Sequence, residues 1–303
     1  MIITQKISFI EILKLTWKAR IQFLLLCTLT FLGHIYIFDG AIEISGILTT
    51  VLGTTLAFFI GFKNNQAYDR WWEARKVWGA LVNDSRSWAR SIINYCSTDS
   101  ENSENLEVTK KKLIHRHIAF LYALKSKLRG SSDKDFHKYL SQDEIDSVEK
   151  QSNIHNAILM NQSTDLEFIS KQGYIDGFRF IELNKLIVKF SDQMGMSERI
   201  SNTVFPPTYH YFTRIFIWLF AITVTLLSAE ANGAWSILIG WIVAVIFFDT
   251  HMIGMYILNP FEPTKSSVSL DQITRTIEIN LLEMMNESDI PEPVKPIDEK
   301  YVM

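Results

Sequence analysis

The stretch that decides the fold is Thr54 to Arg75, "TTLAFFIGFKNNQAYDRWWEAR". It begins as apolar sequence of the kind found inside membranes, and Phe58 and Phe62 lie about one helical turn apart. After Gly61 it runs into asparagines, an arginine and two tryptophans without a further glycine or proline. Because no helix-breaking residue stands where the sequence changes from apolar to polar, the stretch predicts one helix that leaves the bilayer and continues in water.

The composition of the whole chain suits a membrane protein with a large aqueous part. Hydrophobic residues make up 48% of the 303 residues, aromatic residues 13%, and charged residues still reach 21%. The net charge of -3 gives no basic field, so nucleic acid is not an expected partner. Cys27 and Cys96 lie far apart in unlike contexts, so we interpret both as reduced apolar residues rather than as a disulfide or metal pair.

Four apolar segments are long enough, together with the mixed sequence at their ends, to cross a membrane. A helix needs roughly 20 residues to span about 30 Å of hydrocarbon. The leader of the first segment contains Glu11, and no small-x-small cleavage site follows it, so we do not expect a signal peptide. The segments are Ile21 to Phe38, Ile44 to Phe62, Ile215 to Ala229 and Ala234 to Phe248.

The placement of basic residues orients these spans. Four basic residues precede Ile21, the short connections within each pair of spans carry none, and residues 63–208 carry 21. Basic loops stay in the cytoplasm, so we expect a multi-pass inner-membrane protein whose two termini and middle section are cytoplasmic. The expected parts are a cytosolic amphipathic helix over 1–20, transmembrane helices 1 and 2 over 21–62, a cytosolic helical domain over 63–208, transmembrane helices 3 and 4 over 209–258, and a C-terminal cytosolic helix with an extended tail over 259–303.

The middle section is predicted to be helical, which makes the whole chain an all-α membrane protein. Its apolar residues recur at helical spacing, and the alternation of β-branched residues that marks strands is almost absent. The polar stretches "STDSENSEN" at 97–105 and "RGSSDKD" at 129–135 are predicted to be loops. The prolines of "IPEPVKP" at 290–296 predict an extended tail rather than a helix.

Two neighbouring ridges of the second span are candidates for helix packing and for a pore. Small residues four apart let helix backbones approach closely in lipid. Phenylalanines arranged around a shared axis would form a hydrophobic constriction, which gates a pore by excluding water. The alternative is that these rings pack against the other spans. The small ridge is Gly53, Ala57 and Gly61, and the adjacent ridge is Thr54, Phe58 and Phe62.

The residues that follow the second span suit a pore mouth and a membrane boundary. Amide side chains hydrogen-bond without adding charge, and tryptophan rings and arginine side chains anchor helices at the headgroups. Plain interfacial anchoring is the alternative interpretation for all of them. The mouth and anchor residues are Asn64, Asn65, Arg70, Trp71 and Trp72.

The sequence from Phe58 to Arg90 resembles the signature of the bestrophin family, in particular its bacterial members. The Gly-Phe that ends the second span and the Arg-Trp-Trp eight residues further on are both present. "LNPFE" at 258–262 is similar to the Asn-Pro-Phe turn that the family carries after its fourth span. "YIDGFRFIELNKLI" at 174–187 lies at a spacing similar to that of a family helix, and the resemblance extends from about Ile7 to Asn280.

This resemblance implies a homopentamer of helical subunits around one axial ion pathway, with membrane lipid and monovalent ions as its other partners and no cofactor. In the family, three hydrophobic side chains one turn apart line a narrow neck. These positions fall on Thr54, Phe58 and Phe62, and a second, cytosolic constriction falls on Phe178. Threonine stands where isoleucine is common, so this neck is expected to be one rung less hydrophobic.

The resemblance also bears on activity. Animal relatives conduct chloride and other anions, so it favours a passive channel for small anions. A cation-selective channel of the same type and a non-conducting, membrane-anchored signalling or structural module are the alternatives. The sequence contains no glycine-rich phosphate loop, no activated serine or cysteine arrangement and no zinc-ligand spacing, so we do not expect an enzyme.

The remaining ionisable residues near the spans do not predict a metal site. Asp249 and His251 are two residues apart, so on a helix they point in different directions, and we interpret them as anchoring or subunit contacts. His115 and His117 flank Arg116 with the same opposed geometry and are interpreted as surface or packing residues.

Calcium is not expected to control this protein. Animal bestrophins hold calcium with an acidic cluster directly after Asn-Pro-Phe, whereas here Glu262 and Asp271 are far apart with Lys265 between them. Calcium needs six to eight oxygen ligands. Adding or chelating calcium should therefore leave the current of the reconstituted protein unchanged, and a clear calcium dependence would mean that another site exists.

Overall fold

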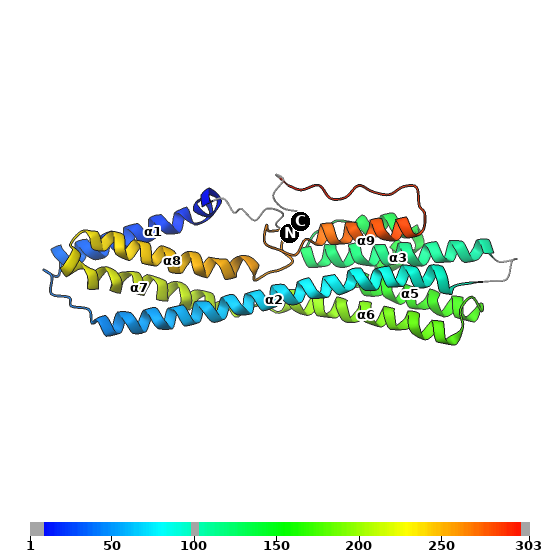
Figure 1. The fold of residues 1–303 in the computed structure, drawn as a ribbon, viewed down its shortest axis with the longest axis horizontal. Coiled ribbons are helices and arrows are strands. Elements are labelled where there is room, and N and C mark those ends of the chain that lie inside the picture. The colour runs from blue at the N-terminus through cyan, green and yellow to red at the C-terminus, as the bar shows by residue number, and fades with distance from the viewer. Residues whose placement is uncertain (1–8, 98–102, 298–303) are drawn as a thin grey trace. The chain divides into compact units, whose positions relative to one another are not determined.

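The computed structural model describes residues 9–97 and 103–297, and these residues form helices without a β-strand (Figure 1). The all-α prediction is therefore confirmed for this part of the chain. The elements are α1 (Phe9–Tyr36), α2 (Gly46–Tyr95), α3 (Ser103–Arg129), the 3-10 helix η2 (Asp135–Tyr139), α4 (Gln142–Val148), α5 (Ile154–Lys171), α6 (Gly177–Asn202), α7 (Pro207–Asn232), α8 (Trp235–Ile257) and α9 (Leu270–Met284).

Among the described residues, four helices are long and apolar enough to cross a membrane, namely α1, α2, α7 and α8. They overlap the four segments that the sequence predicts, although α1 ends at Tyr36, before the predicted Phe38, and α2 begins at Gly46, after the predicted Ile44. α2 is one helix of 50 residues, which confirms that the second span continues past Lys63 without a break. α1 likewise has no break near residue 20, so the described part of the predicted N-terminal helix continues into the first span. The amphipathic face predicted for that helix lies outside the described side chains.

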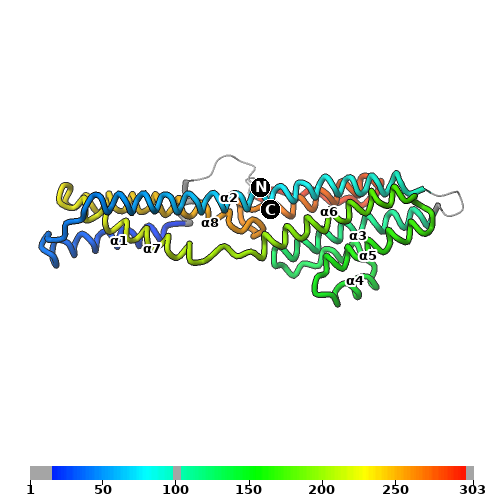
Figure 2. Tube along the Cα trace, turned by 90° about the horizontal axis from the view of Figure 1, so that it is seen from below, coloured from blue at the N-terminus to red at the C-terminus, as the bar shows by residue number. Residues whose placement is uncertain are grey.

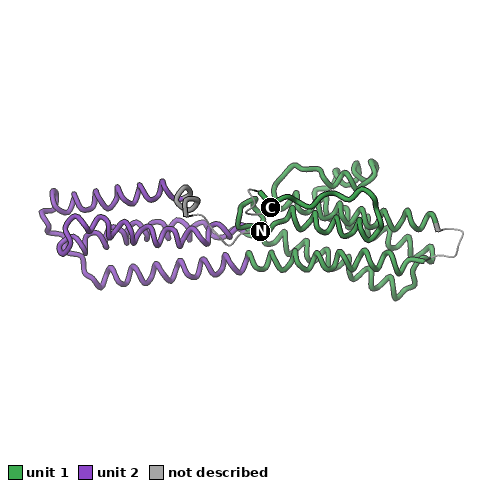
Figure 3. The backbone as a smooth tube through the Cα atoms, turned by 45° about the horizontal axis from the view of Figure 1, so that its top comes forward, with its two compact units in different colours: residues 1–3, 71–203, 260–303 green, residues 4–70, 204–259 purple. Residues whose placement is uncertain are grey.

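The described chain divides into two compact units (Figure 3). We call residues 9–70 and 204–259 the membrane unit, and residues 71–97, 103–203 and 260–297 the extramembrane unit. The unit boundaries lie after positions 70, 203 and 259, whereas the sequence predicts divisions after 62, 208 and 258. α2 contributes its first half to the membrane unit and its second half to the extramembrane unit.

In the membrane unit, α1, α7 and α8 pack against one another (Figures 1 and 2). Gly240 of α8 makes this close packing possible, because a Cβ atom there would lie 2.0 Å from the Thr225 Oγ1 of α7 and 3.2 Å from the Cys27 Sγ of α1. Small residues at such points let helices approach where lipid provides no hydrophobic drive for association. Cys27 is buried and free, as is Cys96 in the extramembrane unit, so both thiols pack as small apolar side chains.

The extramembrane unit has a core that α2 shares with the helices around it. The α2 side chains Trp78 and Trp88 are fully buried, and the Trp88 ring meets the Phe190 ring of α6 edge-on at 6.0 Å. α3 ends at Arg129 and η2 begins at Asp135, so the loop predicted at 129–135 is confirmed. The loop predicted at 97–105 lies partly outside the described residues, and α3 already begins at Ser103.

His117 of α3 is a packing residue inside this core. Its side chain is buried, its ring lies 4.2 Å from that of Phe190, and its Nε2 lies 2.8 Å from the Ser85 Oγ of α2. The Ser85 hydroxyl donates to the Leu81 carbonyl, so the imidazole Nε2–H must be the donor to Ser85. Burial lowers the pKa of His117 to about 3 from its ordinary value of 6.5, because the charged form would lose its hydration.

This histidine predicts that acid destabilises the extramembrane unit. Above pH 6.5 His117 is neutral in both the folded and unfolded states, so it adds no pH dependence there. Between pH 6.5 and about 3 only the unfolded state binds the proton. Over this range the protonation of His117 in the unfolded state should lower the free energy of unfolding by up to about 1.4 kcal/mol for each unit by which the pH is lowered. Urea unfolding followed by tryptophan fluorescence should show a shallower acid dependence for His117→Gln than for wild type, and equal slopes would contradict the prediction.

Candidate ion pathway on helix α2

The ridge of Thr54, Phe58 and Phe62 lies on the outside of the membrane unit. The Phe58 side chain is 62% exposed and that of Phe62 is 51% exposed, and their rings contact each other edge-on with centroids 4.3 Å apart. Thr54 is also exposed, and its hydroxyl donates to the Thr50 carbonyl at 2.9 Å. The two rings therefore do not pack into the core formed with the other spans of the chain, which was the alternative interpretation.

The neighbouring Phe59 behaves in the opposite way. It turns towards α7, where its ring lies 6.1 Å from the ring of Tyr209 and 6.2 Å from that of Phe216. The contrast between adjacent phenylalanines comes from helix geometry, because successive residues point about 100° apart. Phe58 and Phe62 thus share one face of α2, and Phe59 belongs to the face that packs within the chain.

The small ridge of Gly53, Ala57 and Gly61 is used within the chain at one position. A Cβ atom on Gly53 would lie 2.8 Å from the Phe220 Cζ of α7, so Gly53 is at a close helix contact, but inside the subunit. Ala57 is exposed, and a Cβ atom on Gly61 would meet nothing within 4 Å. Ala57 and Gly61 remain accessible for packing against another helix in lipid, which stays a prediction.

The predicted mouth residues Asn64 and Asn65 have different surroundings. The Asn64 amide donates to the Thr250 carbonyl of α8 at 2.9 Å, so this side chain joins two spans. Gly254 permits the contact, because a Cβ atom there would lie 2.2 Å from the Asn64 Oδ1. Asn65 is exposed and remains a candidate for the mouth.

The predicted anchor residues also differ in whether they bond within the chain or are exposed. The Trp71 indole N–H donates to the Ser266 carbonyl at 2.9 Å, and its ring stacks on that of Trp72 with centroids 6.3 Å apart. The Trp71 indole N–H is therefore hydrogen-bonded inside the extramembrane unit and not to a lipid headgroup. Trp72 is 46% exposed and Arg70 is half-buried, so their anchoring role stays a prediction.

Phe178, the predicted cytosolic constriction, lies near the first residue of α6. Its side chain is 86% exposed within the extramembrane unit. The helix start is well defined, because the Asp176 carboxylate caps it by accepting from the Arg179 backbone N–H at 2.9 Å. A large apolar ring held outward at a rigid helix end is typical of a residue that contacts another subunit or lines a pathway.

Sequence reasoning missed a polar cluster behind the phenylalanine ridge. The Lys63 side chain is 1% exposed, and its Nζ lies 3.5 Å from the His251 Nδ1 and 2.9 Å from the Met255 Sδ of α8. His251 in turn lies 3.0 Å from the His210 Nδ1 of α7 through its Nε2, and the two rings are stacked. Lys63 falls in register with the buried Leu56, Ile60 and Ala67 of α2, and that spacing is the signal that would have found it.

Asp249 and His251 do point in different directions, as their spacing predicts. The Asp249 carboxylate accepts from the Arg20 guanidinium of α1 at 2.5 Å, whereas His251 faces α2 and α7. Both side chains thus make contacts within the chain. Arg20 also binds α8 through its carbonyl, which accepts from the Trp241 indole at 2.9 Å.

Comparison with known proteins identifies the family of this chain. A family model described as "Bacterial/Fungal Bestrophin protein" matches residues 9–283. The chain belongs to the bestrophin family. It is 28% identical over 253 residues to voltage-dependent anion channel-forming protein YneE of Escherichia coli K12, a match that covers 83% of this chain and 80% of that protein.

Further relatives and a solved structure agree with this assignment. The chain is 30% identical over 255 residues to voltage-dependent anion channel-forming protein sll1024 of Synechocystis, covering 84% of this bestrophin and 80% of the relative. The crystal structure of a bacterial bestrophin homologue from Klebsiella pneumoniae superposes with a TM-score of 0.81 at 19% identity, covering 89% of this chain and 98% of that one. At this identity the likeness supports the fold alone.

In the segment after Asn-Pro-Phe of this bestrophin, Asp271 forms ion pairs with basic residues of α3. The Asp271 carboxylate lies 2.9 Å from the Lys125 Nζ and 3.4 Å from an Arg129 guanidinium nitrogen of α3. Glu262 is exposed. Within the described ranges, no group of three or more His, Cys, Asp or Glu residues is arranged to hold a metal ion.

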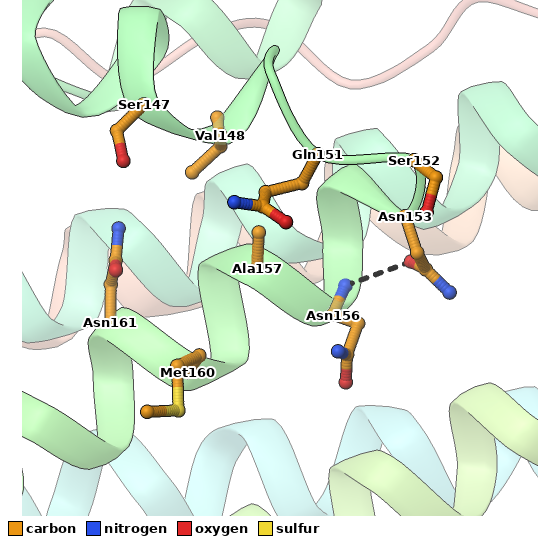
Figure 4. Close-up of a pocket in the computed structure, with 9 residues that line it drawn as sticks. All are labelled: Ser147, Val148, Gln151, Ser152, Asn153, Asn156, Ala157, Met160 and Asn161. Atoms are coloured by element: carbon orange, nitrogen blue, oxygen red, sulfur yellow. Dashed lines mark hydrogen bonds between the residues drawn. The ribbon is translucent and has the colours of Figure 1, made fainter.

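A cavity of about 260 Å³ lies in the extramembrane unit where the segment after α4 meets α5 (Figure 4). Its lining offers hydroxyl and amide groups but no ionisable side chain. The Asn153 side chain caps α5 there, accepting from the Asn156 backbone N–H at 3.0 Å. The lining residues are Ser147, Val148, Gln151, Ser152, Asn153, Asn156, Ala157, Met160 and Asn161.

The contact between α2 and α8 predicts that alanine is far more costly at Gly254 than at a glycine in open space. Gly254→Ala would force a methyl group against Asn64, including its Cα at 3.2 Å, and overpacking of this kind costs about 1–3 kcal/mol. Gly33→Ala, on α1, would place its methyl group where nothing lies within 4 Å and should cost much less. Thermal unfolding in detergent should show a lower Tm for the Gly254 variant alone. Equal Tm values for both variants would mean that α2 and α8 can move apart to accommodate the added methyl group without a loss of stability.

Proposed function

We propose that this bestrophin assembles as a homopentamer and passively conducts chloride and other small anions along an axis lined by α2. The observation that carries the proposal is the exposed ridge of Thr54, Phe58 and Phe62. Among the residues that the structure describes, no helix packs over this ridge, and it lies on a span whose opposite face is buried.

Cyclic assembly gives such a ridge a role. A heterologous contact repeated around an axis closes into a ring, and the same face of each α2 then points to the centre. Ala57 and Gly61, beside the ridge, are small and exposed, so they would allow the α2 helices of neighbouring subunits to approach closely. The proposed ring would place the phenylalanines around a water-filled path rather than against lipid.

The proposed neck would control conduction through hydration. A phenyl ring offers no ligand that replaces the water around an ion, so a narrow ring of phenylalanines opposes passage until it widens. Thr54 would make the outer rung easier to wet, because its hydroxyl is exposed. Phe178 would form a second apolar constriction further along the path.

The names of the relatives support the anion preference, since the proteins of Escherichia coli and Synechocystis are both called voltage-dependent anion channel-forming proteins. A cation-selective channel and a non-conducting membrane module are the competing functions. Purified protein reconstituted into liposomes should release chloride under a gradient, and its mass in detergent should be five times that of the chain. Assembled pentamers that give neither ion flux nor current at any voltage would support the non-conducting module.

The neck can be tested with neighbouring phenylalanines. Replacing Phe58 and Phe62 by Ala should widen and wet the neck and raise the current several-fold. The cost in stability should be small, because both rings are more than half exposed within the chain. Phe59→Ala is the matched control: it removes contacts with Tyr209 and Phe216, so it should lower the Tm without raising the current per channel. A double variant that assembles normally and conducts like wild type would place the gate elsewhere.

A further inference from the structure

Lys63 is the first charged residue after the neck on α2, directly following Phe62. Its side chain points away from the phenylalanine ridge into the membrane unit, where it is 1% exposed. The ammonium nitrogen contacts a thioether and an imidazole, at 2.9 Å from the Met255 Sδ and 3.5 Å from the His251 Nδ1. Neither group carries a negative charge that would neutralise a lysine.

The charged groups around Lys63 leave its charge uncompensated. In the part of the chain that the structure describes, no carboxylate forms an ion pair with Lys63, and the Asp249 carboxylate of α8 is bound to Arg20 of α1 at 2.5 Å. α7 contributes His210 and the cationic Arg214, which is close enough to act on both imidazoles electrostatically. The cluster that α2, α7 and α8 form around Lys63 is therefore net positive.

The hydrogen bonds determine which nitrogens carry protons. With Lys63 as an ammonium group, which can only donate, the His251 Nδ1 is the acceptor. His251 then carries its proton on Nε2 and donates it to the His210 Nδ1 at 3.0 Å. Both imidazoles are neutral in this arrangement, and their aligned dipoles stabilise a charged lysine in place of water. The arrangement thus supplies the ammonium form of Lys63 with an acceptor in place of water.

We propose that Lys63 is the residue that makes the neck prefer anions. This inference rests on the proposed pentameric channel. The neck side chains are uncharged, and a dewetted constriction opposes ions of either sign, so the preference must come from fixed charge nearby. Five-fold symmetry would place five buried lysines behind the phenylalanine ridge. Buried charges act over longer distances than exposed ones, because water and salt screen them less.

Lys63 acts on the permeating ion through its electrostatic field and not by contact. Its test therefore needs a measured quantity that a change in packing alone does not alter. That readout is the reversal potential of the reconstituted channel under a potassium chloride gradient, which gives the chloride-to-potassium permeability ratio. Lys63→Met keeps an unbranched apolar stem without the charge, and Lys63→Arg keeps the charge. Lys76→Met is the matched control, because Lys76 is an exposed lysine of the same helix.

The expected result is a fall in the permeability ratio of at least about tenfold for Lys63→Met, because a single unit charge about 10 Å away already has an effect of that size at an effective dielectric constant near 20, and the variant removes one charge from each subunit. Lys63→Arg and Lys76→Met should keep the wild-type ratio. Lys63→Met should assemble, since removing an uncompensated buried charge relieves a desolvation cost. Lys63→Gln, which is also neutral, should show the same fall and serves if the Met variant does not assemble.

Two outcomes would overturn the inference in different ways. If wild type conducts with an anion preference and the neutral Lys63 variants keep it, Lys63 is a structural residue and the proposed channel stands. If Lys76→Met lowers the ratio as much as Lys63→Met, general surface charge and not the buried lysine sets the preference. A wild-type pentamer without any conductance would instead overturn the proposed function itself.

Discussion

A bilayer offers no hydrogen-bond partner to a peptide group, and the rest of this structure depends on that constraint. Each span must therefore pair its backbone N–H and C=O groups within itself, so α2 is a regular helix throughout its apolar part. The helix then continues through polar sequence to Tyr95 without a break. One continuous helix gives every residue along it a defined direction, because each residue turns the chain by about 100°.

This regularity produces a single buried stripe along the whole of α2. Buried residues recur at spacings of three or four, apart from one gap of seven between Ala67 and Ala74, although the surroundings change from apolar to aqueous. The spacing is that of a helix packed along one seam. The stripe includes Leu56, Ile60, Lys63, Ala67, Ala74, Trp78, Leu81, Ser85, Trp88 and Ile92. The exposed ridge of Thr54, Phe58 and Phe62 lies off this stripe, so the packing of the subunit and the proposed path for ions use different faces of one helix.

Lys63 is a charged residue in a buried stripe whose other members are uncharged. An apolar residue there would pack against α8 more simply, since a buried charge is costly unless polar groups replace its hydration. The chain supplies those groups from two other spans, His251 of α8 and His210 of α7. A costly arrangement built from three helices is typical of a functional requirement, and intramembrane ionisable residues are functional candidates for the same reason.

The four spans, the unbroken second helix and the helical middle section could be predicted from the amino-acid sequence, because they follow from hydrophobic length and periodicity along the chain. The sequence also determined the family, through the Arg-Trp-Trp and Asn-Pro-Phe contexts. Only the tertiary structure decided which α2 residues face inward. Gly53 meets Phe220, Asn64 meets Thr250, and Trp71 meets Ser266, and all three partners lie more than 160 residues away. The same holds for Lys63 and its histidines: periodicity places a lysine on a face of a helix, but what lies opposite depends on how distant helices pack.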